Sequence, residues 1–330
     1  MGEGDAAIAM DAQDEMLQRE AQEWLLRLTS GNVTVADAEA LKRWCARSKT
    51  HAQAFAEASL LWENLGTAAR RLPDPNVLGH GRRSQAATMG RRAFLGGSMA
   101  ASVAMAGYLA MRPPLDLWPS VEELAADYRT RTGEQRRISV ANGVVVDLNT
   151  GSSLNVRREG NEERLELVSG EAAIATTQQL PVRLTIEAAG GQIHATEAQF
   201  NLRCNGSRAI VTCHRGSVGV DYSGRSLSLR EGEQISYANG TLDVATSVDP
   251  AVVMAWREGQ LVFRQTPLSQ VVEEVNRYRS GRIVLVNEEL GRRLVEARVR
   301  LDRIDDLIGL VREAYGAQVT SLPGGIVVLS

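Results

Sequence analysis

A run of nineteen residues without a formal charge, Ala93–Met111, lies about a third of the way along this chain of 330 residues. At a helical rise of roughly 1.5 Å per residue the run is about 28 Å long, close to the ~30 Å hydrocarbon core of a bilayer. Buried helices of water-soluble proteins rarely continue this far without a charge. The run therefore predicts one transmembrane helix, and the alternative is a buried helix of a soluble protein.

The charges on either side of the run predict its orientation. Arg91 and Arg92 end a basic stretch before it, whereas Glu122 and Glu123 follow soon after it. The positive-inside rule then keeps the N-terminal residues in the cytoplasm and exports those that follow. A cleaved signal peptide is disfavoured because about ninety residues precede the run, although the arginine pair is similar to a twin-arginine export signal.

The charge balance and the motifs of the chain argue against several functions. The net charge is -3, and no block of Lys and Arg with interleaved aromatic residues occurs, so direct binding to nucleic acid is not expected. The GxSxG, HExxH, Walker and CxxC patterns are all missing from the sequence. We therefore predict no enzyme activity, no cofactor and no catalytic or cofactor-binding residue.

The three cysteines are too few for a disulfide framework. Cys45 would stay reduced in the cytoplasm, whereas Cys204 and Cys213 would be exported to an oxidising compartment. A metal site built from these two cysteines with His194 and His214 is disfavoured, because the spacings fit no zinc pattern and alternate strand residues point to opposite faces. No metal ligand is predicted.

Residues 1–69 have apolar residues at helical spacing in three stretches, which predicts a cytoplasmic bundle of three short helices. Two capping pairs mark helix starts: Thr34 with Asp37, and Thr50 with Gln53. The predicted core contains three tryptophans: Trp24, Trp44 and Trp62. Residues 70–92 are rich in Pro and Gly and are predicted to be a linker.

Residues 120–248 contain short runs rich in β-branched residues, separated by glycine-containing turns every eight to a dozen residues. This pattern predicts an all-β domain of ten or more short strands, either a sandwich or a solenoid. A tight hairpin at Asn205-Gly206 would place Cys213 opposite Gln199 or Phe200. Cys204 would then lie about 13 to 17 Å along the ladder from Cys213, too far for a disulfide.

Residues 252–330 predict a small α+β domain made of two β-α-β units. Its first strand is expected at Gly259–Arg264, and Thr266 is expected to cap the helix that follows, with Pro267 in its first turn. The last strand, Ile326–Leu329, is expected at a sheet edge, where a partner strand would add to it. The alternative is that this strand is paired within the domain.

The order of these segments resembles the FecR family of single-pass inner-membrane regulators of sigma factors, over nearly the whole chain. Residues 20–66 are similar to the family's N-terminal anti-sigma domain, and residues 133–156, with the blocks RLELVSGEA and VTCHRGSVGV, to its periplasmic β domain. Residues 256–278 are similar to the start of its last domain, which resembles the short N-terminal domain of secretins and TonB-dependent transducers. The resemblance implies a solenoid-like fold for the β domain.

The resemblance also implies partners and a location. An extracytoplasmic-function sigma factor would bind residues 1–69 in the cytoplasm, and the signalling domain of an outer-membrane TonB-dependent transporter would contact the periplasmic part. The resemblance also implies an intramembrane protease as a further partner, and a role in iron or siderophore uptake. The chain would lie in the inner membrane as a single-pass protein, with its N-terminus in the cytoplasm and its C-terminus in the periplasm.

Some family members cleave themselves at a Gly-Thr bond in a GT-x-F pattern. The corresponding stretch here, Ala195–Phe200, has alanine in place of glycine and an altered spacing, so self-cleavage is not expected. Two other functions stay open. One is a membrane-tethered periplasmic scaffold of a secretion or envelope complex, and the other is an anchored periplasmic hydrolase, for which the sequence offers no nucleophile and base.

Overall fold

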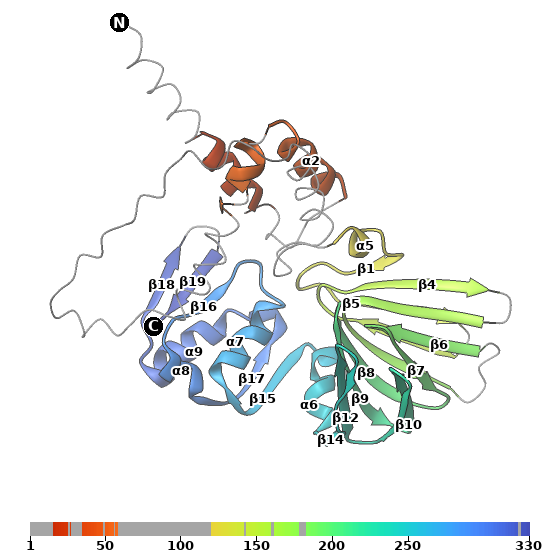
Figure 1. Ribbon diagram of the computed structural model, residues 1–330. Coiled ribbons are helices and arrows are strands. Elements are labelled where there is room, and N and C mark those ends of the chain that lie inside the picture. The colour runs from red at the N-terminus through yellow and green to blue at the C-terminus, as the bar shows by residue number, and fades with distance from the viewer. Residues whose placement is uncertain are drawn as a thin grey trace, which may run out of the picture.

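The structure is a computed structural model that describes residues 16–25, 27, 35–48, 50–55, 57–58, 120–141, 143–159, 162–177, 183–322 and 325–330 (Figure 1). The charge-free run Ala93–Met111, the predicted linker 70–92 and Trp62 lie outside these residues. Among the helices that are described, none is both long and apolar enough to cross a bilayer.

A sheet of fourteen strands dominates the described chain. The short helix α5 (Val121–Leu124) precedes it. All its pairings are antiparallel except that between β5 and β6. The strands are β1 (Tyr128–Arg129), β2 (Arg136–Ala141), β3 (Val144–Leu148), β4 (Ser153–Glu159), β5 (Glu162–Thr176), β6 (Arg183–Ala188), β7 (Gly191–Ala195), β8 (Gln199–Asn205), β9 (Arg208–Arg215), β10 (Ser217–Tyr222), β11 (Arg225–Arg230), β12 (Glu233–Ala238), β13 (Thr241–Leu242) and β14 (Thr246–Ser247).

The long strand β5 joins two halves of this sheet. Its first half pairs with β4 and β6, and its second half pairs with β3 and β8. At the far ends of the two halves, β11 lies against β9 and β12, so the sheet curls nearly into a barrel. The inward side chains form one apolar core, in which Phe200, Leu165 and Ile193 are fully buried.

Gly170 is the residue at which β5 changes direction. Its φ is +92°, a conformation that side chains rarely adopt, and a Cβ there would lie 2.4 Å from Cα of Ser152. The pairing of β4 with β5 shifts register at the same place, between Ser153 and Leu154. Only glycine allows both the backbone conformation and the close approach, so this bend depends on one residue.

The C-terminal unit contains two small sheets with helices between them (Figure 1). Strands β15 and β17 form one sheet, and β16, β19 and β18 form the other, in that order. Its elements are α6 (Pro250–Met254), η3 (Ala255–Glu258), β15 (Gln260–Pro267), α7 (Leu268–Asn276), β16 (Ile283–Leu285), α8 (Glu288–Arg292), β17 (Leu294–Arg300), η4 (Leu301–Arg303), α9 (Asp306–Tyr315), β18 (Val319–Leu322) and β19 (Ile326–Leu329).

The described N-terminal residues form short helical stretches around a small apolar cluster. Residues 16–25 and 50–55 are helical, and α2 covers Val35–Cys45. Trp44 is buried in the cluster and its Nε1 donates to Oε2 of Glu20 at 2.7 Å, whereas Trp24 is only partly buried. The last stretch is capped by Ser48, whose Oγ accepts from the backbone N of His51 at 3.3 Å, so the predicted cap at Thr50 is wrong.

The predicted fold class, a three-helix bundle with a transmembrane helix, a solenoid-like β domain and a small α+β domain, is wrong, because the described chain is largely β and its main sheet nearly closes into a barrel. The described helices are short, and no described helix is able to span a bilayer. A solenoid stacks parallel strands, whereas this sheet is antiparallel at every pairing but one and nearly closes on itself. Antiparallel hairpins follow directly from the short glycine turns, which leave no room for the longer connections of parallel strands.

Two further predictions were wrong for reasons of tertiary structure. Strand β19 does not lie at an edge, because β16 pairs with one side of it and β18 with the other. Thr266 does not cap α7: its Oγ1 donates to the carbonyl of Arg264, and Pro267 occupies the cap position. The predicted hairpin register is confirmed, because Phe200 pairs with Cys213 and both Cys204 and Cys213 are free thiols.

Candidate functional site

The outer face of β5 and β8 is covered by the C-terminal unit. Side chains alternate along these strands, so Ile174 and Leu202 point into the sheet core whereas Glu171, Ala173 and Asn201 point to the other face. Ala173 belongs to the apolar cluster of the C-terminal unit, together with Trp256 and Tyr278. The polar residues of this face are therefore enclosed between the two units.

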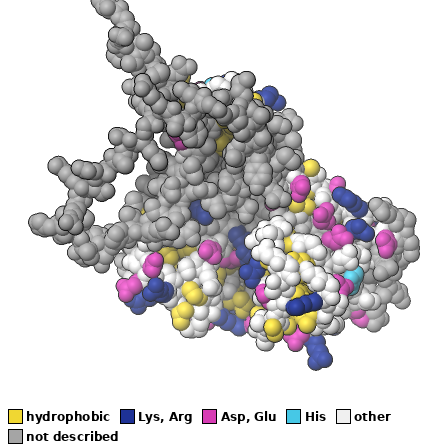
Figure 2. All heavy atoms as spheres, in the orientation of Figure 1, with side chains coloured by type: hydrophobic (Ala, Val, Ile, Leu, Met, Phe, Trp, Pro, Cys, Tyr) yellow, Lys and Arg dark blue, Asp and Glu magenta, His cyan; other side chains and the backbone are white. Residues whose placement is uncertain are grey.

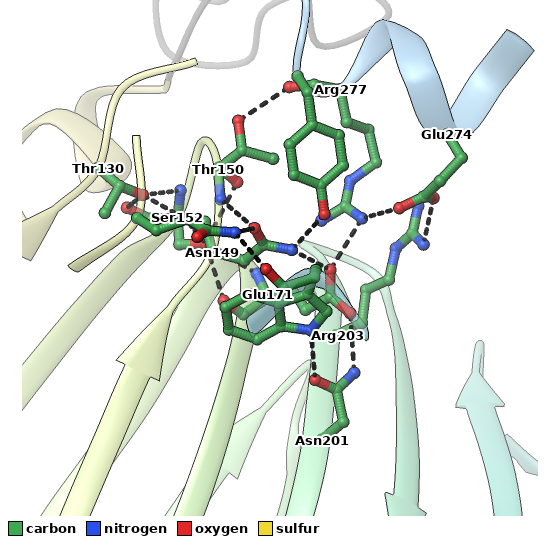
Figure 3. Close-up of polar contacts among 12 residues, drawn as sticks. Thr130, Asn149, Thr150, Ser152, Glu171, Asn201, Arg203, Glu274 and Arg277 are labelled. Atoms are coloured by element: carbon green, nitrogen blue, oxygen red, sulfur yellow. Dashed lines mark hydrogen bonds and ion pairs between the residues drawn. The ribbon is translucent and has the colours of Figure 1, made fainter. Parts of the chain in front are cut away.

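Four buried side chains and one partly buried arginine meet there, and we call Asn149, Glu171, Asn201, Tyr278 and Arg277 the junction cluster (Figure 3). Glu171 follows the bend at Gly170, Asn149 begins the turn after β3, and Asn201 lies on β8. Arg277 and Tyr278 come directly after α7, where their backbone N–H groups donate to Glu274 and Val275. The β sheet thus supplies the carboxylate, and the end of one helix supplies the guanidinium.

Both carboxylate oxygens of Glu171 are occupied. Oε2 lies 2.8 Å from Nη1 of Arg277 and accepts from Nδ2 of Asn149 at 2.8 Å, while Oε1 accepts from Nδ2 of Asn201 at 2.8 Å. Asn149 Nδ2 also donates to the Tyr278 hydroxyl at 2.6 Å. The side chains of Glu171 and Arg277 are only 6% and 19% exposed, so this is a largely desolvated ion pair.

Further contacts extend the junction cluster on both sides. Glu274 accepts from Arg277 at 2.6 Å and from Arg203 at 2.8 Å, which ties α7 to β8. The Thr150 hydroxyl donates to the carbonyl of Arg277 at 2.9 Å, and Trp256 Nε1 donates to Asn201 at 3.3 Å. Every one of these bonds joins residues far apart in the sequence except the Arg277–Glu274 pair.

Electrostatics favour the charged forms of the buried pair. Burial alone would raise the pKa of the Glu171 carboxyl, but the charges of Arg277 and Arg203 with the two amide donors outweigh it and hold that pKa below its usual range. Burial would lower the pKa of the Arg277 guanidinium, yet Glu171 and Glu274 raise it above its usual range. Burial, followed by the charge of Glu171, raises the pKa of Tyr278.

A second ion pair flanks the junction cluster. Asp147 on β3 accepts from Arg137 on β2 at 2.5 Å and from Arg257 on η3 at 2.8 Å, so it too connects the sheet to the C-terminal unit. Burial alone would raise the pKa of the Asp147 carboxyl. The hydrogen bond from Arg137 and the charge of Arg257 outweigh burial, so that pKa lies below its usual value.

The arrangement is suited to holding two units together. Each oxygen of Glu171 has at least one partner from the protein itself. Within the described ranges, no three His, Cys, Asp or Glu side chains are grouped closely enough to hold a metal ion. The junction cluster therefore connects the two units through buried charges that are paired and hydrogen-bonded to one another.

The four residues weighed as a metal site lie in separate settings. His194 pairs with Asp221, Nε2 to Oδ2 at 3.1 Å. Cys204 and Cys213 are buried in the sheet core, and their thiols donate to the carbonyls of Val168 and Gly216. His214 has a buried Nδ1 without a hydrogen-bond partner.

Sequence reasoning did not single out the junction cluster. One signal was available: Glu171 is the only charged residue between Val168 and Thr176, a stretch of small and apolar residues. A lone carboxylate in such a strand indicates either a solvated face or a buried partner, and the sequence does not name the partner. Arg277 lies 106 positions later and only the packing of α7 brings it there.

Comparison with known proteins identifies two segments of the chain. The family described as FecR protein matches residues 126–219, and a domain of unknown function, DUF4880, matches residues 19–61. No curated protein matches the chain.

Among solved structures, a candidate anti-sigma factor from Parabacteroides distasonis ATCC 8503, in a crystal structure at 1.65 Å resolution, has a TM-score of 0.53 and 22% identity. The match covers 62% of this chain and 97% of that one. A second crystal structure with the same description, at 2.50 Å resolution, has a TM-score of 0.52 and 21% identity, covering 61% of this chain and 96% of that one. At these identities the likeness concerns the fold.

The first prediction concerns the buried pair. Glu171→Gln leaves Arg277 with Glu274 as its remaining carboxylate partner and removes the charged acceptor of Asn149 and Asn201, so it should lower the free energy of unfolding by about 1–3 kcal/mol in urea denaturation. The double variant Glu171→Gln with Arg277→Met removes both charges and should recover most of that loss. As a control, Glu288→Gln breaks the exposed Glu288–Arg292 pair and should change stability by no more than about 0.5 kcal/mol. Equal losses for Glu171→Gln and the double variant would contradict the role of the ion pair.

The second prediction is an acid sensitivity of the same connection. The folded pKa values of Glu171 and Asp147 lie below their unfolded values, near 4.3 and 3.9. The stability they contribute is therefore complete above about pH 5 and is lost as the pH falls through the folded values. Urea midpoints measured downward from neutral pH should fall less steeply in the double variant, which lacks the Glu171 carboxylate, than in the parent. Parallel curves would rule out this contribution.

Proposed function

Since this chain carries a FecR domain after a DUF4880 domain, which confirms the resemblance to the FecR family, we propose that it binds an extracytoplasmic-function sigma factor and regulates its activity. The observation that carries the proposal is the order of the two domains in one chain: the DUF4880 match at residues 19–61, then the FecR match at residues 126–219. Membership of this family supports a regulatory role toward a sigma factor.

We assign the sigma factor to the N-terminal residues. Their apolar cluster is small, with Leu25, Trp44 and Phe55 at its centre, and a core of this size leaves a helical unit only marginally stable by itself. A protein partner that covers more of its apolar surface would stabilise it. The chain acts, in this proposal, by binding and not by catalysis.

The remaining units would receive the signal. We propose that residues 120–330 contact the signalling domain of an outer-membrane TonB-dependent transporter, in iron or siderophore uptake, and that an intramembrane protease takes part in release of the sigma factor. The junction cluster supports a relay because a partner that binds either the sheet or the C-terminal unit would move both together. Partner binding would then act on one rigid body.

The third prediction tests the sigma factor. Residues 1–80 used as bait should capture an extracytoplasmic-function sigma factor from a lysate of the native organism, whereas residues 120–330 should not. Expression of residues 1–80 should also make transcription of the target genes independent of the external signal. A sigma factor bound to residues 120–330 would contradict the proposal, and one bound to neither bait would favour a periplasmic scaffold.

The fourth prediction concerns location. We propose that the chain works at the inner membrane with its N-terminus in the cytoplasm and its C-terminus in the periplasm, because arginines precede the charge-free run and carboxylates follow it. A reporter fused after residue 85 should be active only in its cytoplasmic form, and one fused after residue 125 only in its periplasmic form. Reporters that both show the same compartment would refute this location.

A further inference from the structure

Strand β17 presents an unpaired edge. It pairs with β15 on one side, and the sheet that the two strands form has no third member among the described residues. At seven residues β17 is longer than either outer strand of the neighbouring three-stranded sheet. Two-stranded sheets are marginal by themselves, and an edge of this length is a ready template for another strand.

The backbone groups that face this edge can be identified from the pairing with β15. The N–H of Leu301 donates to Gly259, and the carbonyl of Arg293 accepts from Leu268. Backbone groups alternate along an antiparallel strand, so the odd-numbered residues face β15 and the even-numbered ones face the open edge. The carbonyl of Leu294 is taken by the Tyr315 hydroxyl at 2.9 Å, which leaves the edge groups of Glu296, Arg298 and Arg300.

The side chains along β17 are complementary to those of a second β17 strand that runs antiparallel to it. Around Ala297 the order is Val295, Glu296, Ala297, Arg298 and Val299. Val295 and Val299 are buried on the inner face, whereas Glu296 and Arg298 are exposed on the outer face. Two copies of β17 placed antiparallel about Ala297 would set each Glu296 opposite Arg298 of the other copy, and each Val295 opposite a Val299.

We propose that two copies of this chain associate through the open edges of β17, in antiparallel register about Ala297, so that β15 and β17 of both copies form one four-stranded sheet. The two-fold axis passes between Ala297 of one copy and Ala297 of the other, and these two residues exchange no backbone hydrogen bonds. The flanking Glu296–Arg298 pairs exchange backbone hydrogen bonds, because their groups are the ones that face the edge. A two-fold interface requires a self-complementary surface, and this register supplies it.

The surroundings of the edge suit the same partner. Leu294 is 53% exposed, one of few large apolar side chains in the described chain with that exposure, and the register sets it opposite the aliphatic stem of Arg300 in the second copy. One oxygen of Glu296 accepts from the backbone N of Gln265 at 3.2 Å, which holds the carboxylate over the sheet with its other oxygen free for Arg298. No ion pair of Arg298 occurs among the described residues.

The fifth prediction uses exchange of charge. Sedimentation of the purified full chain should show a concentration-dependent dimer, weak because one strand pair buries little area. Glu296→Arg sets arginine against Arg298, and Arg298→Glu sets glutamate against Glu296, so each should weaken dimerisation by about tenfold. Combined in one chain, the two substitutions recreate the opposite-charge pairs and should restore it. Circular dichroism melts identify any variant that is misfolded.

Cross-linking tests the register itself. Opposite residues without shared hydrogen bonds have Cα atoms about 4.5 Å apart, within the range of a disulfide. In a Cys45→Ser background, Ala297→Cys should therefore form a covalent dimer on mild oxidation. Glu296→Cys is the matched control: its counterpart lies diagonally, about 7–8 Å away, and should cross-link far less. A monomer at every concentration, no rescue by the combined charge exchange, or equal cross-linking of the two cysteines would each overturn the proposal.

Discussion

The ion pair between Glu171 and Arg277 connects the two structural units, and Glu274 is a second carboxylate partner of Arg277. Desolvation of a carboxylate or a guanidinium costs several kcal/mol, and here the cost is offset by their attraction together with the amide donors of Asn149 and Asn201. The consequence reaches beyond local stability. Because the pair is satisfied in one arrangement of the sheet and the helix α7, it selects a single placement of the C-terminal unit.

The geometry of the sheet makes this pair possible. Gly170 turns β5 so that its second half joins β3 and β8, and Glu171 then projects from the outer face immediately after the bend. Ala173, two residues further on, is small enough for the C-terminal apolar cluster to pack against the strand. Gly170, Ala173 and Glu171 together form the surface that the C-terminal end of α7 contacts.

This connection bears on how a signal would pass along the chain. Regulation by partner binding requires that a contact at one surface change the free energy of a state elsewhere, and a rigid unit transmits displacement better than two loosely tethered ones. The junction cluster lies on the β5 and β8 side of the C-terminal unit, while the open edge of β17 belongs to its two-stranded sheet. Association at that edge would leave the junction cluster intact, so the rigid body would carry both interactions at once.

Much of the local structure was predictable from the residues alone. The glycine turns predicted short strands from residue 136 onward, the spacing of Leu268, Val271, Val272 and Val275 predicted the buried face of α7, and the Asn205-Gly206 turn predicted the partner of Cys213. The near closure of the sheet, the central place of β19 and the burial of Glu171 were not predictable. Periodicity reports which face of a single element is apolar, because that depends on neighbours in the sequence. Strand order and the covering of an outer face depend on residues more than a hundred positions apart, and only the folded chain brings Arg277 to Glu171.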